Sequence, residues 1–426
     1  MKKVLVITYY WPPAGGPGVQ RWLKFVKYLR DFDIEPVVYV PENPNYPIVD
    51  ESFMHDIPSG VQVHKLKIKE PYRLANIFSK KAKRISSGII TQKNQSFAEK
   101  LLLWIRGNFF IPDARKFWIK PSVRFLSKLI QEEQITTMIT TGPPHSVHLI
   151  GNRIKEQLGI HWVADFRDPW TSIGYHKQLK LTASSRKKHK ELEKRVLQNA
   201  DQIVVTSRTT KREFEAIAKT PITCITNGYD TRDITEASTL DEKFTISHIG
   251  SMLTGRNPEN LWKVLSELIK SNAAFKYAVQ LQFIGVISTD VLETVHQYGL
   301  EPYVRVLGYV SHEEAIRYQR SSQVLLLTEI NAEETRGIIP GKLFEYMSAG
   351  RPIFGIGPKD WDVAALVAET KTGAIFDYDS YSELKNVLLN WFAQYKVNQL
   401  SVSSANVEQY SRKKLTEKLS KILQWE

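Results

Sequence analysis

The chain has 426 residues, of which 42% are hydrophobic and 24% are charged, and its formal net charge is +13. This length and composition indicate a globular protein that is too long for one ordinary core, so we expect two or three domains. The single cysteine, Cys224, excludes a disulfide framework and a cysteine-based metal cluster, and is compatible with a reducing cytoplasm.

The N-terminus begins with Met1-Lys2-Lys3 and the apolar run 4–8, which together are superficially similar to a signal peptide. The apolar run is short, however, and it ends at Trp11-Pro12-Pro13 without a small-residue cleavage site. We therefore predict a first buried strand here. No apolar run in the chain approaches the length of a membrane span.

A glycine-rich loop follows this strand and precedes a helical pattern of apolar residues that begins at Trp22. Glycine lets backbone amides face a ligand without a clashing side chain, so a strand, such a loop and a helix predict a phosphate-binding or close-approach turn. The spacing is not the full G-x-G-x-x-G, and a structural turn stays open for each glycine alone. The glycines are Gly15, Gly16 and Gly18.

The stretch 65–128 holds 16 Lys and Arg residues against 3 Asp and Glu residues, an excess equal to the net charge of the whole chain. Aromatic and aliphatic runs at 101–105, 109–111 and 117–119 interleave with these cations. This mixture suits docking on an anionic membrane surface. A solvated basic face remains the alternative, and a nucleic-acid patch is the least favoured interpretation.

Polar residues follow two predicted strands, 136–141 and 161–164. The first strand leads into Gly142-Pro143-Pro144-His145, and the second delivers Asp165-Phe166-Arg167-Asp168. Ligands bind at the carboxyl ends of strands in open α/β sheets, so His145 could contact an acceptor or a phosphate. Capping or packing is the alternative for His145 and for His148. Two carboxylates and an arginine are costly to bury unless they pair, and an Asp165–Arg167 structural pair is one solution.

Alternating strands and helices continue to the C-terminus, without an internal repeat or a low-complexity tract. A basic helix is expected at about 184–197, and a turn at Asn227-Gly228 ends the first half. Glycines after strand 245–249 echo those of the first half, as two similar nucleotide-binding folds would.

The stretch Pro340–Gly355 predicts a loop, a short helix and a buried strand. Pro340 suits a first helical position, and Gly350 can take the left-handed conformation that ends a helix. A helix N-terminus beside Lys342 is suited to hold a diphosphate, and Glu345 could accept two vicinal ribose hydroxyls. The alternative is an ordinary amphipathic helix with a lysine and a glutamate on its surface.

This stretch resembles the donor-binding segment of retaining glycosyltransferases of family 4, which have two facing Rossmann-like domains in the arrangement called GT-B. The other blocks fit that family in the same order over almost the whole chain. The family carries two glutamates separated by seven residues, and Glu345 matches the second, which binds the ribose. Gly337 replaces the first glutamate, which usually lies near the donor sugar, so the identity of the sugar stays open.

The resemblance implies a donor site in which Arg256 and Lys342 clamp the diphosphate and neutralise the leaving group. The glycine loop around Gly16 would face the donor phosphates or the acceptor, and the loop at Gly308 would lie near the nucleobase. The donor-binding residues that we expect are Gly16, Arg256, Gly308, Gly341, Lys342 and Glu345.

On the acceptor side the family has a polar residue close to the reacting sugar, in a loop similar to 165–170. We expect Asp168, and after it Asp165, to orient or deprotonate the acceptor hydroxyl, with His145 as a third candidate. No cofactor and no metal are expected, because cationic side chains and helix dipoles would neutralise the leaving group.

The fold that we expect is α/β of the GT-B type, with a central cleft. An acceptor-binding Rossmann-like domain would span 1–232, a nucleotide-sugar-binding one 233–407, and a helix at about 408–426 would cross back onto the first domain.

We therefore expect a retaining glycosyltransferase that moves a sugar from a nucleotide-diphosphate donor, a UDP-sugar, to a saccharide or lipid-linked acceptor in cell-surface polysaccharide biosynthesis. It would be cytoplasmic, with docking on the inner face of the plasma membrane as the interpretation of the basic stretch, and without a nucleic-acid partner. Two alternatives stay open: a sugar-nucleotide epimerase of the same architecture, and a non-catalytic polyanion-binding protein.

Overall fold

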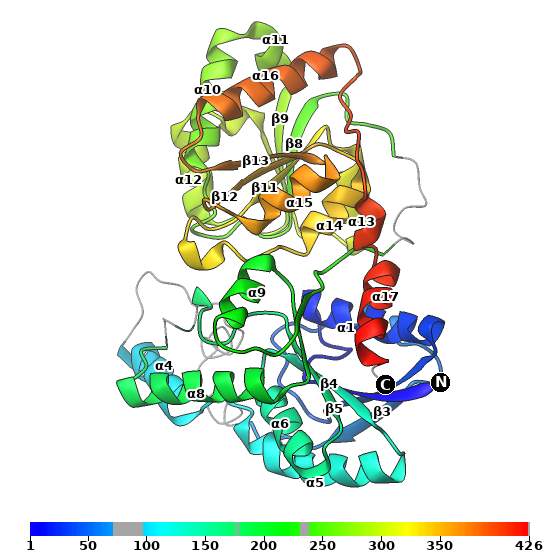
Figure 1. Cartoon of the computed structure of the whole chain (residues 1–426). Helices are drawn as coiled ribbons and strands as arrows, with labels where there is room; N and C mark the ends of the chain where they lie inside the picture. The colour runs from blue at the N-terminus through cyan, green and yellow to red at the C-terminus, as the bar shows by residue number, and fades with distance from the viewer. Residues whose placement is uncertain (71–96, 175, 177–178, 231–237, 425–426) are drawn as a thin grey trace. The chain divides into compact units, whose positions relative to one another are not determined.

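The computed structural model describes residues 1–70, 97–174, 176, 179–230 and 238–424 (Figure 1). The chain divides into two compact units, of which unit 1 is Met1–Thr226 with Arg412–Glu426 and unit 2 is Asn227–Ser411. The domain boundary expected at residue 232, and the part of the basic stretch between residues 71 and 96, lie outside the described residues.

Unit 1 contains a seven-stranded sheet in the order β3-β2-β1-β4-β5-β6-β7. All neighbouring strands are parallel. The order reverses between β1 and β4, which makes this the switch point where ligands bind in doubly wound sheets. The strands are β1 (Lys2–Thr8), β2 (Ile34–Pro41), β3 (Gln62–Leu66), β4 (Thr137–Gly142), β5 (His161–Phe166), β6 (Gln202–Val205) and β7 (Ile222–Cys224).

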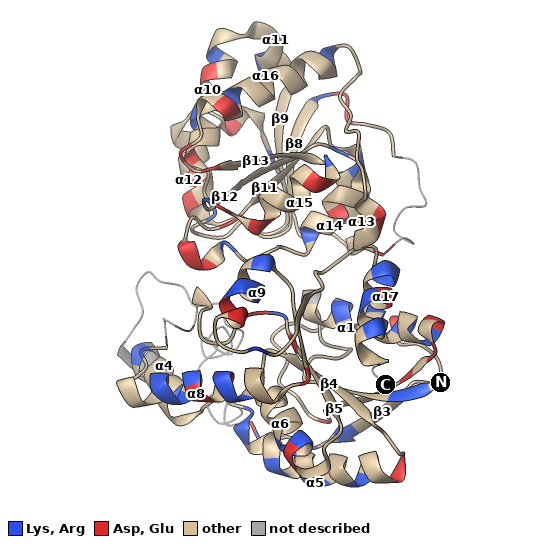
Figure 2. Ribbon diagram, in the orientation of Figure 1, with Lys and Arg blue, Asp and Glu red and all other residues tan. Residues whose placement is uncertain are grey.

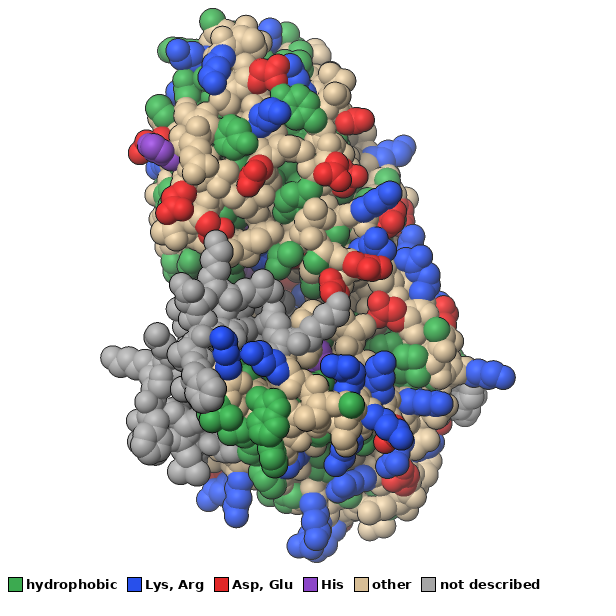
Figure 3. Space-filling view, turned by 90° about the vertical axis from the view of Figure 1, so that its left-hand side faces the viewer, with side chains coloured by type: hydrophobic (Ala, Val, Ile, Leu, Met, Phe, Trp, Pro, Cys, Tyr) green, Lys and Arg blue, Asp and Glu red, His purple; other side chains and the backbone are tan. Residues whose placement is uncertain are grey.

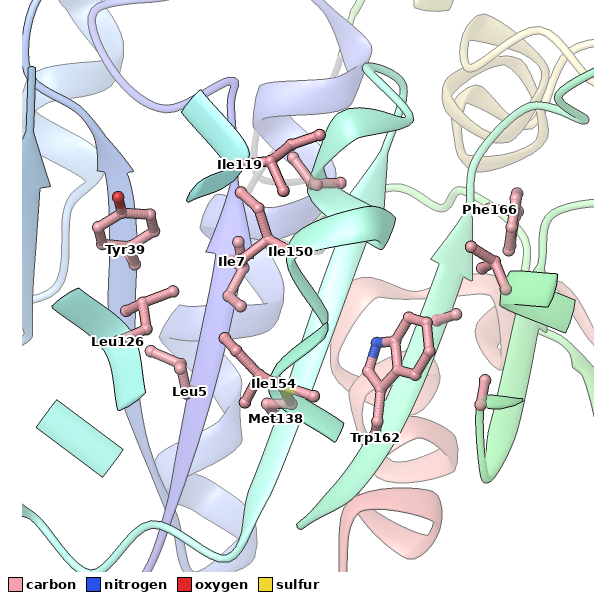
Figure 4. Close-up of a cluster of buried hydrophobic side chains, with 14 of the residues drawn as sticks. Leu5, Ile7, Tyr39, Ile119, Leu126, Met138, Ile150, Ile154, Trp162 and Phe166 are labelled. Atoms are coloured by element: carbon pink, nitrogen blue, oxygen red, sulfur yellow. The ribbon is translucent and has the colours of Figure 1, made fainter. Parts of the chain in front are cut away.

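Helices cover both faces of this sheet, because alternate residues of its central strand point to opposite sides. Leu5 and Ile7 pack in one core cluster with residues of α5 and α6, which Figure 4 shows in close-up. Val4 and Val6 pack in another cluster with α1. The helices are α1 (Pro17–Leu29), α4 (Phe97–Phe109), α5 (Lys116–Glu132), α6 (Ser146–Leu158), α8 (Ala183–Asn199), α9 (Arg208–Glu215) and α17 (Arg412–Leu423).

The C-terminal helix α17 packs within unit 1. Its Leu415, Leu419 and Leu423 are buried in the same cluster as α1, and the side-chain amide of Gln424 donates to the carbonyl of Phe32 at 2.8 Å.

Unit 2 has the same kind of architecture, built on a six-stranded sheet in the order β10-β9-β8-β11-β12-β13. Its strands are also parallel, and its switch point lies between β8 and β11. The strands are β8 (Phe244–Ile249), β9 (Val279–Ile284), β10 (Val304–Gly308), β11 (Val324–Thr328), β12 (Ile353–Gly357) and β13 (Gly373–Asp377), and the helices are α10 (Glu259–Ser271), α11 (Ala273–Ala278), α12 (Thr289–Gln297), α13 (His312–Ser321), α14 (Lys342–Ala349), α15 (Asp362–Thr370) and α16 (Ser382–Lys396).

The loop, helix and strand predicted for residues 340–355 are confirmed by α14 and β12. Gly350 has a φ of 69°, the left-handed conformation expected at the end of the helix. The start was predicted wrongly: α14 begins at Lys342, and Pro340 lies in the turn before it, where its carbonyl accepts from Leu343 at 3.0 Å.

Both units are therefore Rossmann-like, as the sequence predicts. Among the helices in the described ranges, none combines the length and the apolar composition needed to cross a membrane.

Candidate functional site

Lys342 lies at the N-terminus of α14, and its ammonium reaches the carboxyl end of β8. Its Nζ is 3.2 Å from Nε2 of His248. Gly250 has a φ of 106°, a backbone conformation that favours glycine, and a Cβ atom at this position would lie 2.7 Å from the same Nζ. The phenol of Tyr346 accepts from the amide of Ile249 at 2.9 Å, which fixes α14 against β8.

The protonation of His248 follows from its partners. Its Nδ1 lies 3.0 Å from the carbonyl of Leu326, which can only accept, so Nδ1 carries the proton. Nε2 therefore carries no proton, and its lone pair accepts a hydrogen bond from the ammonium of Lys342. Burial, and next to it the positive charge of Lys342, lower the pKa of His248 well below its ordinary value, which keeps the ring neutral.

The same surroundings lower the pKa of Lys342. Burial lowers the pKa of Lys342 to about 8, and the positive charge of Arg256 adds to this effect. The carboxylates of Glu345 and Glu329 oppose it. Two cations and two carboxylates of unit 2 therefore interact at one place, beside the switch point of the sheet.

Arg256 is held by a carboxylate that the sequence did not indicate. Its Nε and one terminal nitrogen donate to the two carboxylate oxygens of Glu329, at 3.1 and 3.2 Å. Glu329 follows the end of β11 and is fully buried, whereas the side chain of Arg256 is 28% exposed. This bidentate pair presents a fixed guanidinium at the surface of unit 2.

Glu345 lies in the first turn of α14 and is half-buried. One of its oxygens accepts from the side-chain amide of Gln319 at 3.0 Å. Gly341 is the residue before α14. Gly308 lies at the end of β10, where its carbonyl accepts from the amide of Gly285 at 2.6 Å. Five of the six expected donor residues are therefore at or near the carboxyl edge of the sheet of unit 2.

Gly16, the sixth, belongs to unit 1. It precedes α1 with a φ of 101°, and its carbonyl accepts from the amide of Val19 at 3.1 Å. It therefore lies in the turn after β1, at the switch point of that sheet.

The acceptor-side candidates are all in unit 1, where Asp165 is an internal anchor. One of its oxygens accepts from Arg21 at 3.1 Å and the other from the indole of Trp22 at 2.8 Å. Both charged side chains are only 1% exposed. The Asp165–Arg167 pair considered from the sequence is wrong, because Arg21 is the partner and Arg167 donates to the carbonyls of Gly142 and Pro143.

Asp168 and His145 both line a cavity of about 310 Å³. Burial raises the pKa of Asp168, and the adjacent guanidinium of Arg167 opposes that rise. The ring of His145 stacks on Trp170 with a centroid separation of 4.7 Å. It is 4% exposed, and within the described residues neither ring nitrogen has a hydrogen-bond partner.

His145 is neutral, because burial lowers its pKa well below the ordinary value. A neutral imidazole offers one donor and one acceptor, which together match a hydroxyl group. His148 is engaged instead: its Nδ1 lies 2.9 Å from the hydroxyl of Thr140, and burial lowers its pKa to about 3.

Arg115 also lines the cavity, and it belongs to a buried charge network that the sequence analysis missed. Arg115 lies 2.9 Å from Glu70, and the phenol of Tyr9 donates to the same carboxylate at 2.8 Å. Arg115 lies within the basic stretch 65–128. Within the described ranges, no group of three or more His, Cys, Asp or Glu residues is placed to hold a metal ion.

The sequence matches two family models in succession. The model for Glycosyltransferase Family 4 covers residues 18–233, and the model for Glycosyl transferases group 1 covers residues 243–394. No curated protein matches the chain in sequence.

Several solved structures share the fold. HepE of Anabaena in complex with UDP is 13% identical over 99% of both chains, with a TM-score of 0.62. TarM of S. aureus, as a variant in complex with Fondaparinux, alpha-GlcNAc-glycerol and UDP, is 11% identical over 100% of both chains, with a TM-score of 0.60. WaaG, a glycosyltransferase involved in lipopolysaccharide biosynthesis, is 11% identical over 99% of this chain and 100% of its own, with a TM-score of 0.55.

Two Rossmann-like units and a family model that covers the first half of the chain lead to one assignment. The chain is a glycosyltransferase that belongs to family 4 and has the GT-B fold.

Proposed function

We propose that this protein transfers a sugar from a UDP-sugar to a saccharide or lipid-linked acceptor, with retention of anomeric configuration, in the synthesis of a cell-surface polysaccharide. The observation that carries the donor proposal is that the positive charges of Lys342 and Arg256 interact beside the N-terminus of α14. Full positive charges and helix amides in one place suit a diphosphate. HepE, which shares the fold, binds UDP in its solved complex.

In this proposal Lys342 and Arg256 contact the diphosphate. As the bond between the anomeric carbon and the diphosphate oxygen breaks, they stabilise the negative charge that develops on the leaving group. Glu345 accepts the two ribose hydroxyls, and Gln319 holds its carboxylate in place. Gly341 contributes helix amides, Gly308 leaves space beside the nucleobase, and Gly16 lets the loop of unit 1 approach the substrates.

On the acceptor side we propose Asp168 as the group that orients the hydroxyl and takes its proton, with neutral His145 as a second contact to it. The raised pKa of Asp168 makes its carboxylate a better proton acceptor than an exposed aspartate. Both oxygens of Asp165 are occupied, so we assign to Asp165 the positioning of the loop that carries Asp168.

The acceptor and its location are supported by two observations. The basic stretch with its interleaved apolar residues suits an anionic membrane surface, which we place at the inner face of the plasma membrane. WaaG, of the same fold, is involved in lipopolysaccharide biosynthesis.

The donor is tested by a thermal-shift and hydrolysis screen of common nucleotide sugars with the wild type, Glu345→Ala and, as a matched control, Glu293→Ala, an exposed glutamate of α12. We expect one donor to raise the Tm of the wild type and of the control, and to be slowly hydrolysed by both, with Glu345→Ala losing both effects.

If the folded wild type responds to no nucleotide sugar, the proposed transfer reaction is wrong. Conversion of the donor into its epimer, without hydrolysis or transfer, would assign the epimerase alternative instead.

A further inference from the structure

Helix α4 presents apolar side chains to solvent. We call Leu101, Leu102, Trp104 and Phe109 the apolar arc; their side chains are 47%, 41%, 37% and 59% exposed. On a helical projection these positions fall on one side, whereas Leu103 and Gly107 fall on the other side and are buried. A surface helix normally turns its apolar side to the core, so this arrangement marks a contact surface.

The two sides of α4 are fixed by contacts with the segment that leads into α8. A Cβ atom at position 107 would lie 2.7 Å from the carbonyl of Leu179, so this approach requires glycine. The side-chain oxygen of Asn108 accepts from the amide of Thr182, the N-cap of α8, at 2.8 Å. Helices α4 and α8 are therefore held as neighbours within unit 1.

Helix α8 carries a row of exposed cations, which Figure 2 shows as successive blue bands on its ribbon. Of its two carboxylates, Glu193 is buried and accepts from the hydroxyl of Thr171 at 2.6 Å. Glu191 is exposed and lies 3.9 Å from Lys187. We call the exposed cations the basic row: Arg186, Lys187, Lys188, Lys190, Lys194 and Arg195.

We propose that the apolar arc of α4 and the basic row of α8 together form a docking surface for an anionic lipid bilayer. The space-filling view of this side of the molecule shows hydrophobic side chains grouped among Lys and Arg side chains (Figure 3). Phe117 of α5 is a further apolar side chain, 53% exposed, and its ring centroid lies 6.3 Å from that of Phe110, just beyond α4. The ammonium of Lys116 lies 5.1 Å from the Phe117 ring centroid.

A bilayer fits this surface better than a polyanion does. The phosphates of a polyanion would explain the basic row, but a bound polyanion would leave the large apolar side chains of the arc exposed to water. A bilayer interface accepts apolar side chains at the acyl boundary and cations at the headgroups simultaneously. The basic row lies outside the stretch 65–128, so the surface is built from two parts of the sequence.

The inner side of α4 connects this surface with the proposed acceptor site. Arg106, Gly107 and Phe110, at the end of α4 and just beyond it, line the same cavity as Asp168 and His145. One helix thus has a bilayer-facing side and a cavity-facing side. Resting on the proposed function, this places a lipid-borne acceptor beside the groups that would receive it.

The test measures how much of the full chain sediments with vesicles. One kind of vesicle contains phosphatidylcholine alone, and the other contains phosphatidylcholine and phosphatidylglycerol in equal parts. We expect binding to the anionic vesicles that weakens as salt is raised, because salt screens the basic row. Replacing Arg186, Lys190 and Lys194 by glutamine should weaken it by about 100-fold.

Leu101→Ser with Phe109→Ser should weaken vesicle binding by about tenfold or more, through loss of apolar burial, and the loss should persist at high salt. Two matched controls should leave binding unchanged. One replaces the exposed Tyr277 and Val397 of unit 2 by serine. The other replaces Lys413, Lys414 and Lys418 of α17 by glutamine, with the same change in net charge.

The proposal is overturned if the wild type does not bind anionic vesicles, or if it binds duplex DNA more tightly than the vesicles. It is also overturned if either control variant lowers vesicle binding as much as the arc or basic-row variant that it matches. UDP binding, measured in parallel, should be equal in all variants. A chain that binds vesicles but no UDP would refute the proposed donor and leave the docking surface standing.

Discussion

The ammonium of Lys342 lies 3.2 Å from Nε2 of His248, a buried imidazole whose other nitrogen is committed to the carbonyl of Leu326. The cation at the centre of the proposed donor site is thus held by a neutral acceptor. Arg256 is held by a carboxylate instead, which offsets its charge. Lys342 therefore keeps its charge available for a ligand, and its protonation state should control binding.

The affinity for UDP should fall as pH rises through the pKa of Lys342, which is about 8. Below this pKa the ammonium is charged and attracts the diphosphate, and above it the neutral amine does not. Between pH 7 and pH 9 the charged fraction falls by about tenfold, and the affinity measured by titration calorimetry should fall by a similar factor.

Lys342→Arg separates this effect from a general pH dependence, because a guanidinium stays charged over that range. UDP affinity of this variant should be nearly flat between pH 7 and pH 9. An equal decline in wild type and in Lys342→Arg would show that another group is responsible.

Lys342→Met should stabilise the protein while abolishing UDP binding. The folded-state pKa of Lys342 lies below the unfolded value, so at pH 7 folding works against the charge. Removing that charge should raise the free energy of unfolding at pH 7 by about 2–3 kcal/mol. This gain should shrink as pH rises from about 8 towards 10.5, because the wild type then loses the same proton.

Urea denaturation at pH 7 and at pH 10 measures this difference. Lys270→Met, at an exposed lysine of α10, is the control, and it should change stability by about 0.5 kcal/mol or less. Destabilisation by Lys342→Met at pH 7 would contradict the prediction.

Arg256 and Glu329 should behave as a coupled pair. Arg256→Met leaves the fully buried Glu329 carboxylate without its cation, and should destabilise unit 2 by roughly 3 kcal/mol. Adding Glu329→Gln should restore more than half of that loss, whereas UDP binding should stay weak in both variants.

A double-mutant cycle in urea denaturation measures the coupling. If the effects of the two substitutions simply add, the carboxylate does not depend on Arg256 and the bidentate pair is not what stabilises this end of β11.

The segment 340–355 could be read from the sequence because its signals are local. Lys342, Glu345 and Gly350 act through their spacing within one helix, and the structure confirms that helix. The parallel sheets were equally predictable, since both depend on apolar runs that alternate with helical patterns.

The partners of the site residues could not be predicted, because they come from distant parts of the chain. Glu329 is 73 residues from Arg256, and Arg21 is 144 residues from Asp165. Only the order of the strands brings such residues together. The pairing considered for Asp165 was with the nearby Arg167, and that local choice was wrong for this reason.

Asp165 and Asp168 are three residues apart, yet their substitution should have opposite effects on stability. Asp165→Asn leaves Arg21, which is 1% exposed, without its counter-charge, and should cost about 3–5 kcal/mol of unfolding free energy at pH 7. Asp168→Asn should leave stability unchanged or increase it. The pKa of Asp168 is raised by burial, so its charged form is the one that folding disfavours at pH 7.

Thermal unfolding of the two variants, with Asp201→Asn as a control at a partly exposed aspartate paired with Lys155, measures the contrast. Equal destabilisation by Asp165→Asn and Asp168→Asn would make Asp168 a structural residue and remove it from the proposed acceptor site. The predicted result instead separates the two roles: Asp165 stabilises the fold of unit 1, whereas the charge of Asp168, which Arg167 offsets only in part, works against stability, as is typical of a group with a chemical role.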